Sequence, residues 1–291
     1  MLHTFGRHWP LYLIEATLLG IFMLSASIAV ALVQHPDSPL SRRIRSPFAR
    51  RATIGAAMGL TAVALIYSPW GQRSGAHMNP AVTLSFAAMG RIATHDAAFY
   101  VAAQFGGGIL GMLAAGLLLG PRIAHPSVNH VRTVPGSRGT AAALLAEAVI
   151  SFALLSAVLA LGRSGAAPYT GFAAGGMVAL FITFEAPLSG MSMNPARTVA
   201  SAFAARSADS IWVYVVAPTT AMLLAAAAHT AAYGRADAAP TLTPHAAHRC
   251  GLHCRGVNRN GNRHVVVGIE HGEAATHPMP RRGEATPSTI P

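Results

Sequence analysis

The chain has 291 residues, of which 52% are hydrophobic and 11% are charged, and its mean hydropathy is +0.43. Because a soluble domain usually carries about a quarter charged residues, this composition excludes an ordinary soluble protein and indicates a helical bundle in lipid. The net charge of +11 comes from 21 arginines that cluster mainly outside the apolar runs, in 42–51 and 235–282; since no aromatic residues interleave with them, nucleic acid is excluded as a partner.

Six apolar runs are each long enough to form a spanning helix, which needs about 20 residues to cross a hydrocarbon core of about 30 Å. No small-residue cleavage site follows the first run, so we expect it to be retained as a helix. The predicted spans are 11–33, 52–69, 97–119, 140–161, 169–187 and 211–233, of which the second is the shortest.

Two further apolar runs are too short to span and begin at Asn-Pro-Ala triplets. Each offers about eleven helical residues, or about 16 Å, which is half a bilayer. The triplet starts a helix by local rules, because Asn accepts an orphan backbone N–H and Pro lacks the N–H that the next position would leave unpaired. We expect each Asn amide nitrogen to stay free to donate into a lumen. The triplets are Asn79-Pro80-Ala81 and Asn194-Pro195-Ala196.

The chain also repeats itself. Glu15 in the first run is echoed by Glu147 in the fourth, and HMNPAVTLSF is echoed by SMNPARTVAS. Each half, about 9–120 and 140–233, holds three spans, and this odd number requires the second half to be inserted upside down. An inverted repeat with broken helices near the midplane indicates a pathway across the membrane.

Backbone that we predict to be non-helical leads into each half-helix, over 71–78 and 188–193. Inside a membrane such backbone is tolerated only where it is buried or lines a cavity, so its carbonyls would form a ladder of acceptors along a pore. The inverted halves bring both half-helix N-termini to the bilayer centre, each with roughly half a positive charge. One triplet alone would be an ordinary helix start, but two in matching places favour a pore.

These features together resemble the aquaporin, or major intrinsic protein, family over about residues 9–233. The resemblance rests on the paired glutamates, SGAHMNPAVT, YVAAQFGGGILG, GMSMNPAR and the total of six spans plus two half-helices. It implies an all-α membrane fold and a homotetramer with one pore per subunit. It also implies a passive channel for water or small neutral solutes, with no enzyme activity and no cofactor.

The resemblance assigns roles to four residues. Glu15 and Glu147 are isolated carboxylates in apolar runs, where such groups are expensive and usually functional. A proton relay is one reading, but no second titratable group lies within a turn, and the family reading is that each carboxylate supports a half-helix loop. Arg197 matches the selectivity arginine, which donates hydrogen bonds to the solute and repels cations. His77 either offers a ring nitrogen to the pore or is a satisfied loop histidine.

The other positions of the family's selectivity filter leave the substrate open. They correspond to Met191, Ile182 and either Met58 or Gly59. Water-selective members commonly place aromatic and His residues there, and this chain has neither. However, Thr198 and Ala202 stand where glycerol-conducting members carry Asp and a basic residue. The two indicators disagree, so water and small uncharged solutes such as glycerol or urea both remain candidates.

Two other classes of function compete with the neutral-solute channel. A formate–nitrite type anion channel also uses six spans and half-helices, and two positive helix ends with Arg197 would attract anions; it predicts no doubled Asn-Pro-Ala, however. A membrane enzyme or proton-coupled carrier needs acid/base groups or metal ligands in the membrane, and the spans offer only two symmetric glutamates.

The ends and loops bear on location and orientation. We expect a multi-pass protein of a bacterial inner membrane, and the family fold places both termini in the cytoplasm. The loops that would then face outward hold more arginines than the inner ones, which conflicts with the positive-inside rule.

Residues 234–291, rich in Pro, Gly, His and Arg, are predicted to be a mostly disordered tail. Its soft-metal ligands are irregularly spaced, so we expect no metal site; they are His245, His248, Cys250, His253 and Cys254.

Overall fold

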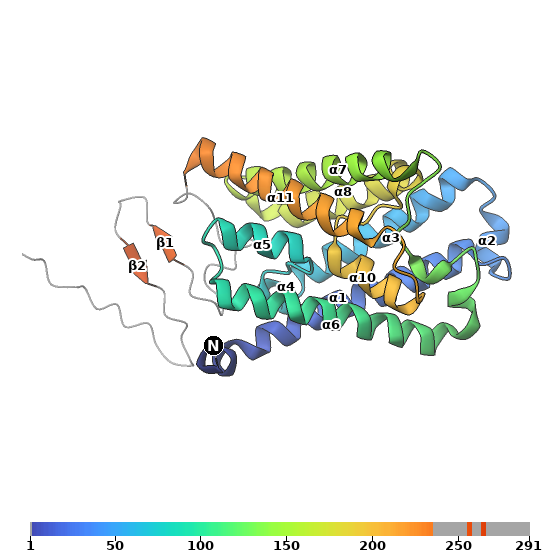
Figure 1. Ribbon diagram of the computed structural model, residues 1–291, viewed down its shortest axis with the longest axis horizontal. Coiled ribbons are helices and arrows are strands. Elements are labelled where there is room, and N and C mark those ends of the chain that lie inside the picture. Colours follow the sequence, from blue (N-terminus) through green and yellow to red (C-terminus); the bar gives the residue numbers. More distant parts are fainter. Residues whose placement is uncertain (1, 235–254, 258–262, 266–291) are drawn as a thin grey trace, which may run out of the picture.

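The computed structural model describes residues 2–234, 255–257 and 263–265 (Figure 1). Its long helices run side by side, and the shorter ones lie inside the bundle or at its ends. The long helices are α1 (Leu2–Gln34), α3 (Pro47–Tyr67), α6 (Thr94–Leu119), α7 (Gly139–Gly162), α8 (Thr170–Phe184) and α11 (Ile211–Tyr233). The short ones are α2 (Pro39–Arg43), α4 (Pro69–Ser74), α5 (Pro80–Ala88), α9 (Ala186–Ser189) and α10 (Pro195–Ala204), with 3-10 turns η1 (Gly120–Ala124), η2 (Asn129–Val131) and η3 (Ala167–Tyr169).

Six helices of the described chain are long and apolar enough to cross a membrane, and they overlap the six predicted spans. The predicted all-α membrane fold is therefore confirmed. The second span was predicted to be the shortest, which is wrong, because the fifth, 167–184, is shorter. Helix α1 begins at the end of the bundle where α11 finishes, and α2 lies at the opposite end (Figure 1). We refer to the latter as the α2 end.

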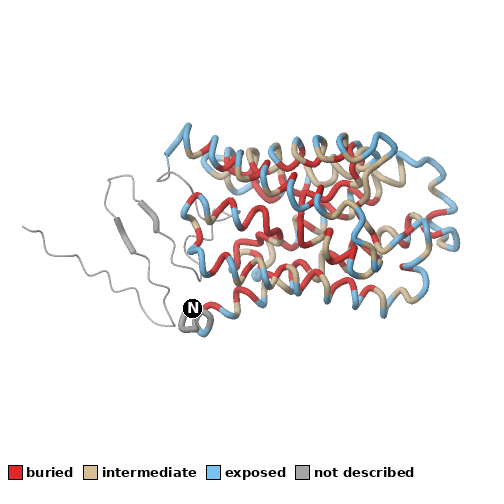
Figure 2. The backbone as a smooth tube through the Cα atoms, in the orientation of Figure 1, coloured by how far each residue is buried: buried red, intermediate tan, exposed pale blue. Residues whose placement is uncertain are grey.

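The outside of the bundle is apolar and its interior is partly polar, which is the reverse of a soluble protein. Large hydrophobic side chains face outward, with Leu117 90% exposed and Leu60 70% exposed, whereas Glu15 and Glu147 are fully buried. Figure 2 shows the buried segments along the middle of the bundle and exposed ones around it. An apolar exterior of this extent requires lipid around it.

Close helix crossings depend on glycine. In the α1–α6 contact, a Cβ on Gly107 would overlap the backbone of Ala16. In the α3–α8 contact, a Cβ on Gly59 would lie 2.5 Å from the carbonyl oxygen of Gly175. Gly107 and Gly59 therefore serve packing within one chain, because only glycine lets the backbones approach this far.

The two half-helices begin where the Asn-Pro-Ala triplets predict. Asn79 caps α5 by accepting the N–H of Ala81, and Asn194 caps α10 by accepting the N–H groups of Ala196 and Arg197. Each triplet's proline occupies the first helical position, where no backbone N–H is needed.

The backbone before each half-helix is more helical than the sequence predicted. Helix α4 continues to Ser74 and α9 covers Ala186–Ser189, so only 75–78 and 190–193 are non-helical. The prediction of irregular backbone over 71–78 and 188–193 was therefore wrong for 71–74 and for 188–189. The reason is local: the Ser68 hydroxyl caps α4 at the N–H of Gly71, and Gly75 in the left-handed region ends it.

The segment predicted to be a tail is described only in part. Strands β1 (Arg255–Val257) and β2 (Arg263–Val265) pair antiparallel, with Gly256 opposite His264. The sequence did not predict this pairing. The histidines and cysteines weighed as metal ligands lie outside the described residues.

Candidate functional site

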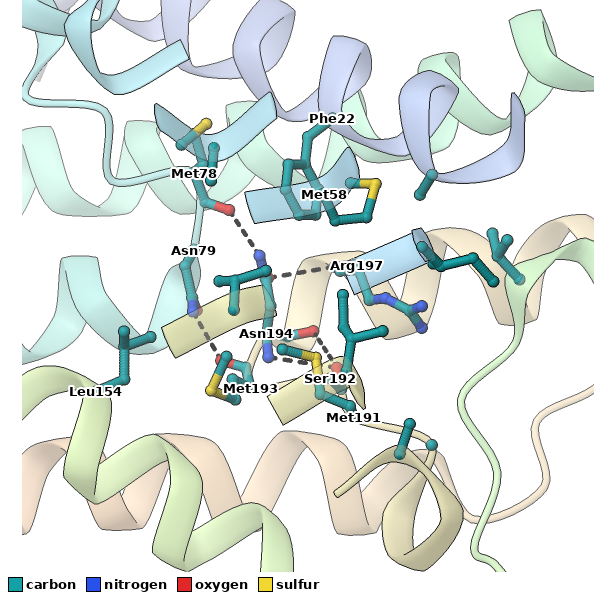
Figure 3. Close-up of a pocket in the computed structure, with 18 of the residues that line it drawn as sticks. Phe22, Met58, Met78, Asn79, Leu154, Met191, Ser192, Met193, Asn194 and Arg197 are labelled. Carbon is teal, nitrogen blue, oxygen red and sulfur yellow. Dashed lines mark hydrogen bonds between the residues drawn. The ribbon is translucent and has the colours of Figure 1, made fainter. Parts of the chain in front are cut away.

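A cavity of about 450 Å³ lies within the bundle and is lined by both halves of the chain. Figure 3 shows its middle, where Asn79, Asn194 and Arg197 lie between apolar side chains. Its walls come from α1, α3, α7 and α8, and from the loops that precede the two half-helices. The inverted repeat thus places equivalent backbone on both sides of one passage.

The two triplets are cross-linked at the centre of the cavity. Asn79 Nδ2 donates to the carbonyl oxygen of Met193, and Asn194 Nδ2 donates to that of Met78, both at 2.7 Å (Figure 3). Our expectation of wholly free amide nitrogens was therefore wrong: each uses one of its two hydrogens to tie the opposite loop. Each amide nitrogen carries a second hydrogen that this bond does not use.

Each loop adopts the same unusual backbone. Gly75 and Gly190 have positive φ, and two non-glycine residues follow in the left-handed region in each loop. Non-glycine residues in this region cost on the order of 1 kcal/mol or more, so the surrounding structure must hold them there. The four residues are Ala76 (φ 47°), Met78 (φ 47°), Met191 (φ 54°) and Met193 (φ 54°).

Glu15 holds the first loop. Its carboxylate accepts hydrogen bonds from Ser74 Oγ (2.7 Å) and from the backbone N–H groups of His77 (3.0 Å) and Met78 (2.7 Å). Gln104 Nε2 also donates to it at 2.8 Å. A fully buried carboxylate is retained because these donors replace its lost water.

Glu147 holds the second loop in the same way. It accepts from Ser189 Oγ and from the N–H groups of Ser192 and Met193, each at 2.7 Å. Since these bonds fix the left-handed residues, the carbonyls between them have fixed positions along the cavity. This geometry is what the predicted role of Glu15 and Glu147, support of the two half-helix loops, requires.

A pair of tyrosines was missed at the sequence level. Tyr100 donates to the carbonyl oxygen of Ser74 at 2.9 Å, and Tyr214 donates to that of Ser189 at 2.5 Å. Each ties the C-terminal turn of α4 or α9 to a spanning helix. Their matching places after the two half-helices were the available signal, but both read as ordinary aromatic residues within apolar runs.

Of the positions expected to form the filter, all but one line the cavity. Met58, Ile182, Met191 and Arg197 all line the cavity, whereas Gly59 faces α8. Met58 is thus placed at the wall and Gly59 is not. Arg197 projects along the cavity in Figure 3, and its Nη1 is buried without a hydrogen-bond partner.

Phe22 and Leu154 complete the wall beside the triplets and were not predicted (Figure 3). They follow Glu15 and Glu147 by two helical turns, so helical periodicity places each on the same face as its glutamate. The signal was therefore present in the repeat.

Four further residues are engaged or buried. His77 lines the cavity, and its Nδ1 is 3.1 Å from Thr83 Oγ1, which fits a loop histidine with a hydrogen-bond partner. That it offers a ring nitrogen to the pore stays a prediction. Thr198 bonds Thr133 and Ser192 through its hydroxyl and is buried, as is Ala202. Glu185, just beyond α8, is also buried.

Comparison with known proteins identifies similar chains. The family model for the major intrinsic protein matches residues 13–229. The rice protein "Aquaporin NIP3-1" (Oryza sativa subsp. japonica) is 36% identical over 202 residues, covering 68% of this chain and 62% of the relative. The maize protein "Aquaporin NIP2-2" (Zea mays) is 38% identical over 184 residues, covering 62% and 60%. The match thus spans about three fifths of each relative.

The fold has a solved counterpart. The X-ray structure of the aquaglyceroporin from Plasmodium falciparum superposes with a TM-score of 0.62 at 17% identity, covering 76% of this chain and 94% of that one. At this identity the likeness concerns the fold.

Proposed function

Since the chain belongs to the major intrinsic protein family, we propose that it is a passive channel for water and small uncharged solutes that excludes protons and ions. The observation that carries this proposal is the cavity between the cross-linked triplets, whose walls hold hydrogen-bond donors and acceptors in fixed positions. The formate–nitrite alternative finds no support among the relatives, which are named aquaporins.

Within this proposal each half contributes matching parts. The triplets Asn79-Pro80-Ala81 and Asn194-Pro195-Ala196 orient the permeating molecule at the centre. Arg197 with Met58, Ile182 and Met191 forms the filter, while Glu15 and Glu147 support the loops. The channel domain comprises 1–233, with half-repeats at about 9–120 and 140–233, and it needs no cofactor or metal.

Assembly and location extend the proposal. The protein is a multi-pass membrane protein, and we infer a homotetramer in which each subunit has its own pore. We keep both termini in the cytoplasm, so that the α2 end faces outward. The relatives reported above are plant proteins and give no support to the expectation of a bacterial inner membrane.

Selectivity gives the first test. Met58, Ile182 and Met191 offer an apolar and adaptable wall opposite one guanidinium, and each hydrogen bond that water loses there costs about 1–3 kcal/mol. We expect the channel to conduct glycerol or urea in addition to water. Replacing Ile182 with His makes the wall more polar and narrows the cavity. The ratio of solute permeability to water permeability should fall about tenfold, which is the lower end of the range for a one-group change in an apolar pocket.

Swelling of proteoliposomes in water, glycerol and urea gradients measures this ratio, with Ile182→Val as the shape-conserving control. A wild-type protein that conducts water but rejects all such solutes would contradict the prediction. The loop backbone, and not these side chains, would then set the aperture.

Proton exclusion gives a second test. Both half-helix N-termini point at the centre of the cavity, so a cation there meets two positive dipole ends. The change Asn194→Asp removes the donor to Met78 and adds a carboxylate at this point. We expect proton leak to rise about tenfold, because lowering a barrier by about 1.4 kcal/mol has that effect.

A pH-sensitive dye inside liposomes records the leak, and water permeability of the same sample shows that the variant is folded. Asn194→Ser is the neutral control and should leak little. Equal leak in the Asp variant and the Ser control would mean that the barrier lies elsewhere.

A further inference from the structure

The cavity is strongly basic toward the α2 end of the bundle. Arg51 near the start of α3, Arg132 in the loop after η2, and Arg197 at the start of α10 all line it. No Asp or Glu is among the described residues that line it. We call these three residues the arginine vestibule.

Two of the three guanidiniums are held in place by single contacts. Arg51 Nε donates to the carbonyl oxygen of Thr183 at 3.0 Å. Arg132 Nη2 lies 3.4 Å from a carboxylate oxygen of Asp209, whose side chain is 82% exposed. These contacts position both groups but use only part of their donors, since each guanidinium carries five N–H bonds.

Arg197 has the largest unmet requirement. Its Nη1 is buried and has no hydrogen-bond partner, although buried donors are nearly always paired. Glu147 lies near enough to influence it, but the carboxylate of Glu147 is already occupied by loop donors. Asp209 on the rim and Glu147 behind the wall therefore leave the vestibule with an excess of positive charge and open donors.

We propose that the arginine vestibule binds a small carboxylate anion, which occludes the channel from the α2 end. A carboxylate matches a guanidinium geometrically, because its two oxygens accept two parallel N–H bonds. Within the chain itself, Arg132 already makes a single contact of 3.4 Å with the carboxylate of Asp209. The blocking effect rests on the proposed channel function, whereas the binding site stands on its own.

The bound anion stops at the vestibule and does not pass. Beside Arg197 the cavity wall includes the apolar side chains of Phe22 and Met58 (Figure 3) and of Ile182, which cannot replace the hydration of a charge. An ion moved into such surroundings without partners loses several kcal/mol of hydration. The anion therefore occupies the mouth of the cavity and blocks water until it dissociates.

The experiment compares succinate with succinamide, its uncharged analogue, at neutral pH and matched ionic strength. Osmotic water permeability of proteoliposomes is recorded with and without each compound. At a concentration equal to its dissociation constant, succinate fills half of the sites and permeability falls about twofold. Succinamide should have no effect. The thermal unfolding midpoint of the purified protein in detergent should rise with succinate only.

Arg51→Gln and Arg132→Gln should each reduce both responses, and either variant suffices if the other does not fold. The inhibition is expressed as the ratio within each variant, so changes in basal permeability cancel. Arg138→Gln is the matched control, because Arg138 is exposed and is not part of the cavity lining. It should retain the full response.

The outcomes separate the site from the channel. Equal effects of succinate and succinamide, or full inhibition in both Gln variants, would overturn the site. Succinate uptake into the liposomes would overturn the claim that the anion stops at the mouth. If wild-type liposomes conduct no more water than empty ones, the proposed function fails, while the unfolding midpoint still tests the site.

Discussion

Replacing Glu147 with Leu is expected to abolish conduction. The change leaves three buried donors unpaired, namely Ser189 Oγ and the N–H groups of Ser192 and Met193. Each unsatisfied donor costs about 1–3 kcal/mol, so the loop loses on the order of 3–9 kcal/mol of support. Since the left-handed residues before Asn194 are costly without that support, the loop should leave its position and close the cavity.

Glu147→Gln separates this structural role from a proton relay. The glutamine oxygen can still accept from the loop, so conduction should fall only in part, whereas a relay would lose proton transport and keep water transport. Glu185→Gln is the control, because that carboxyl is also buried, whereas the N–H groups of Ser192 and Met193 donate to Glu147. Water permeability per reconstituted protein measures the effect. Normal permeability of the Leu variant would contradict the structural role.

Replacing Gly107 with Leu is expected to prevent the protein from folding. A Cβ there already overlaps the backbone of Ala16, and backbone atoms cannot rotate away as a side chain does. The crossing of α1 and α6 would have to open, which separates Glu15 on α1 from Gln104 on α6. Overpacking costs about 1–3 kcal/mol in ordinary cores and more where the backbone must move.

Gly106→Leu provides the matched control one position earlier. No atom lies within 4 Å of a Cβ at Gly106, and the residue is exposed on the outside of the bundle. The yield of monodisperse protein in detergent and its unfolding temperature measure both variants. Similar yields from the two would mean that the α1–α6 crossing tolerates a wider spacing than the structure indicates.

The sequence by itself determined the elements and their repeat. The apolar runs predict the six spans because membrane thickness fixes their length, and the triplets predict the half-helix starts because capping involves only neighbouring residues. The positions of Glu15 and Glu147 in the repeat predict equivalent roles. These inferences succeeded since their physical causes act within a few residues or along one helix.

Only the tertiary structure decided which side chains meet. Whether Met58 or Gly59 reaches the cavity depends on how α3 is rotated against α8. Gly59 lies in the contact between these two helices and therefore cannot face the cavity. The bonds from Asn79 to Met193 and from Asn194 to Met78 join residues far apart in the sequence, so local rules left both amides free. Helix rotation and the docking of loops depend on packing throughout the bundle, which no single stretch of sequence contains.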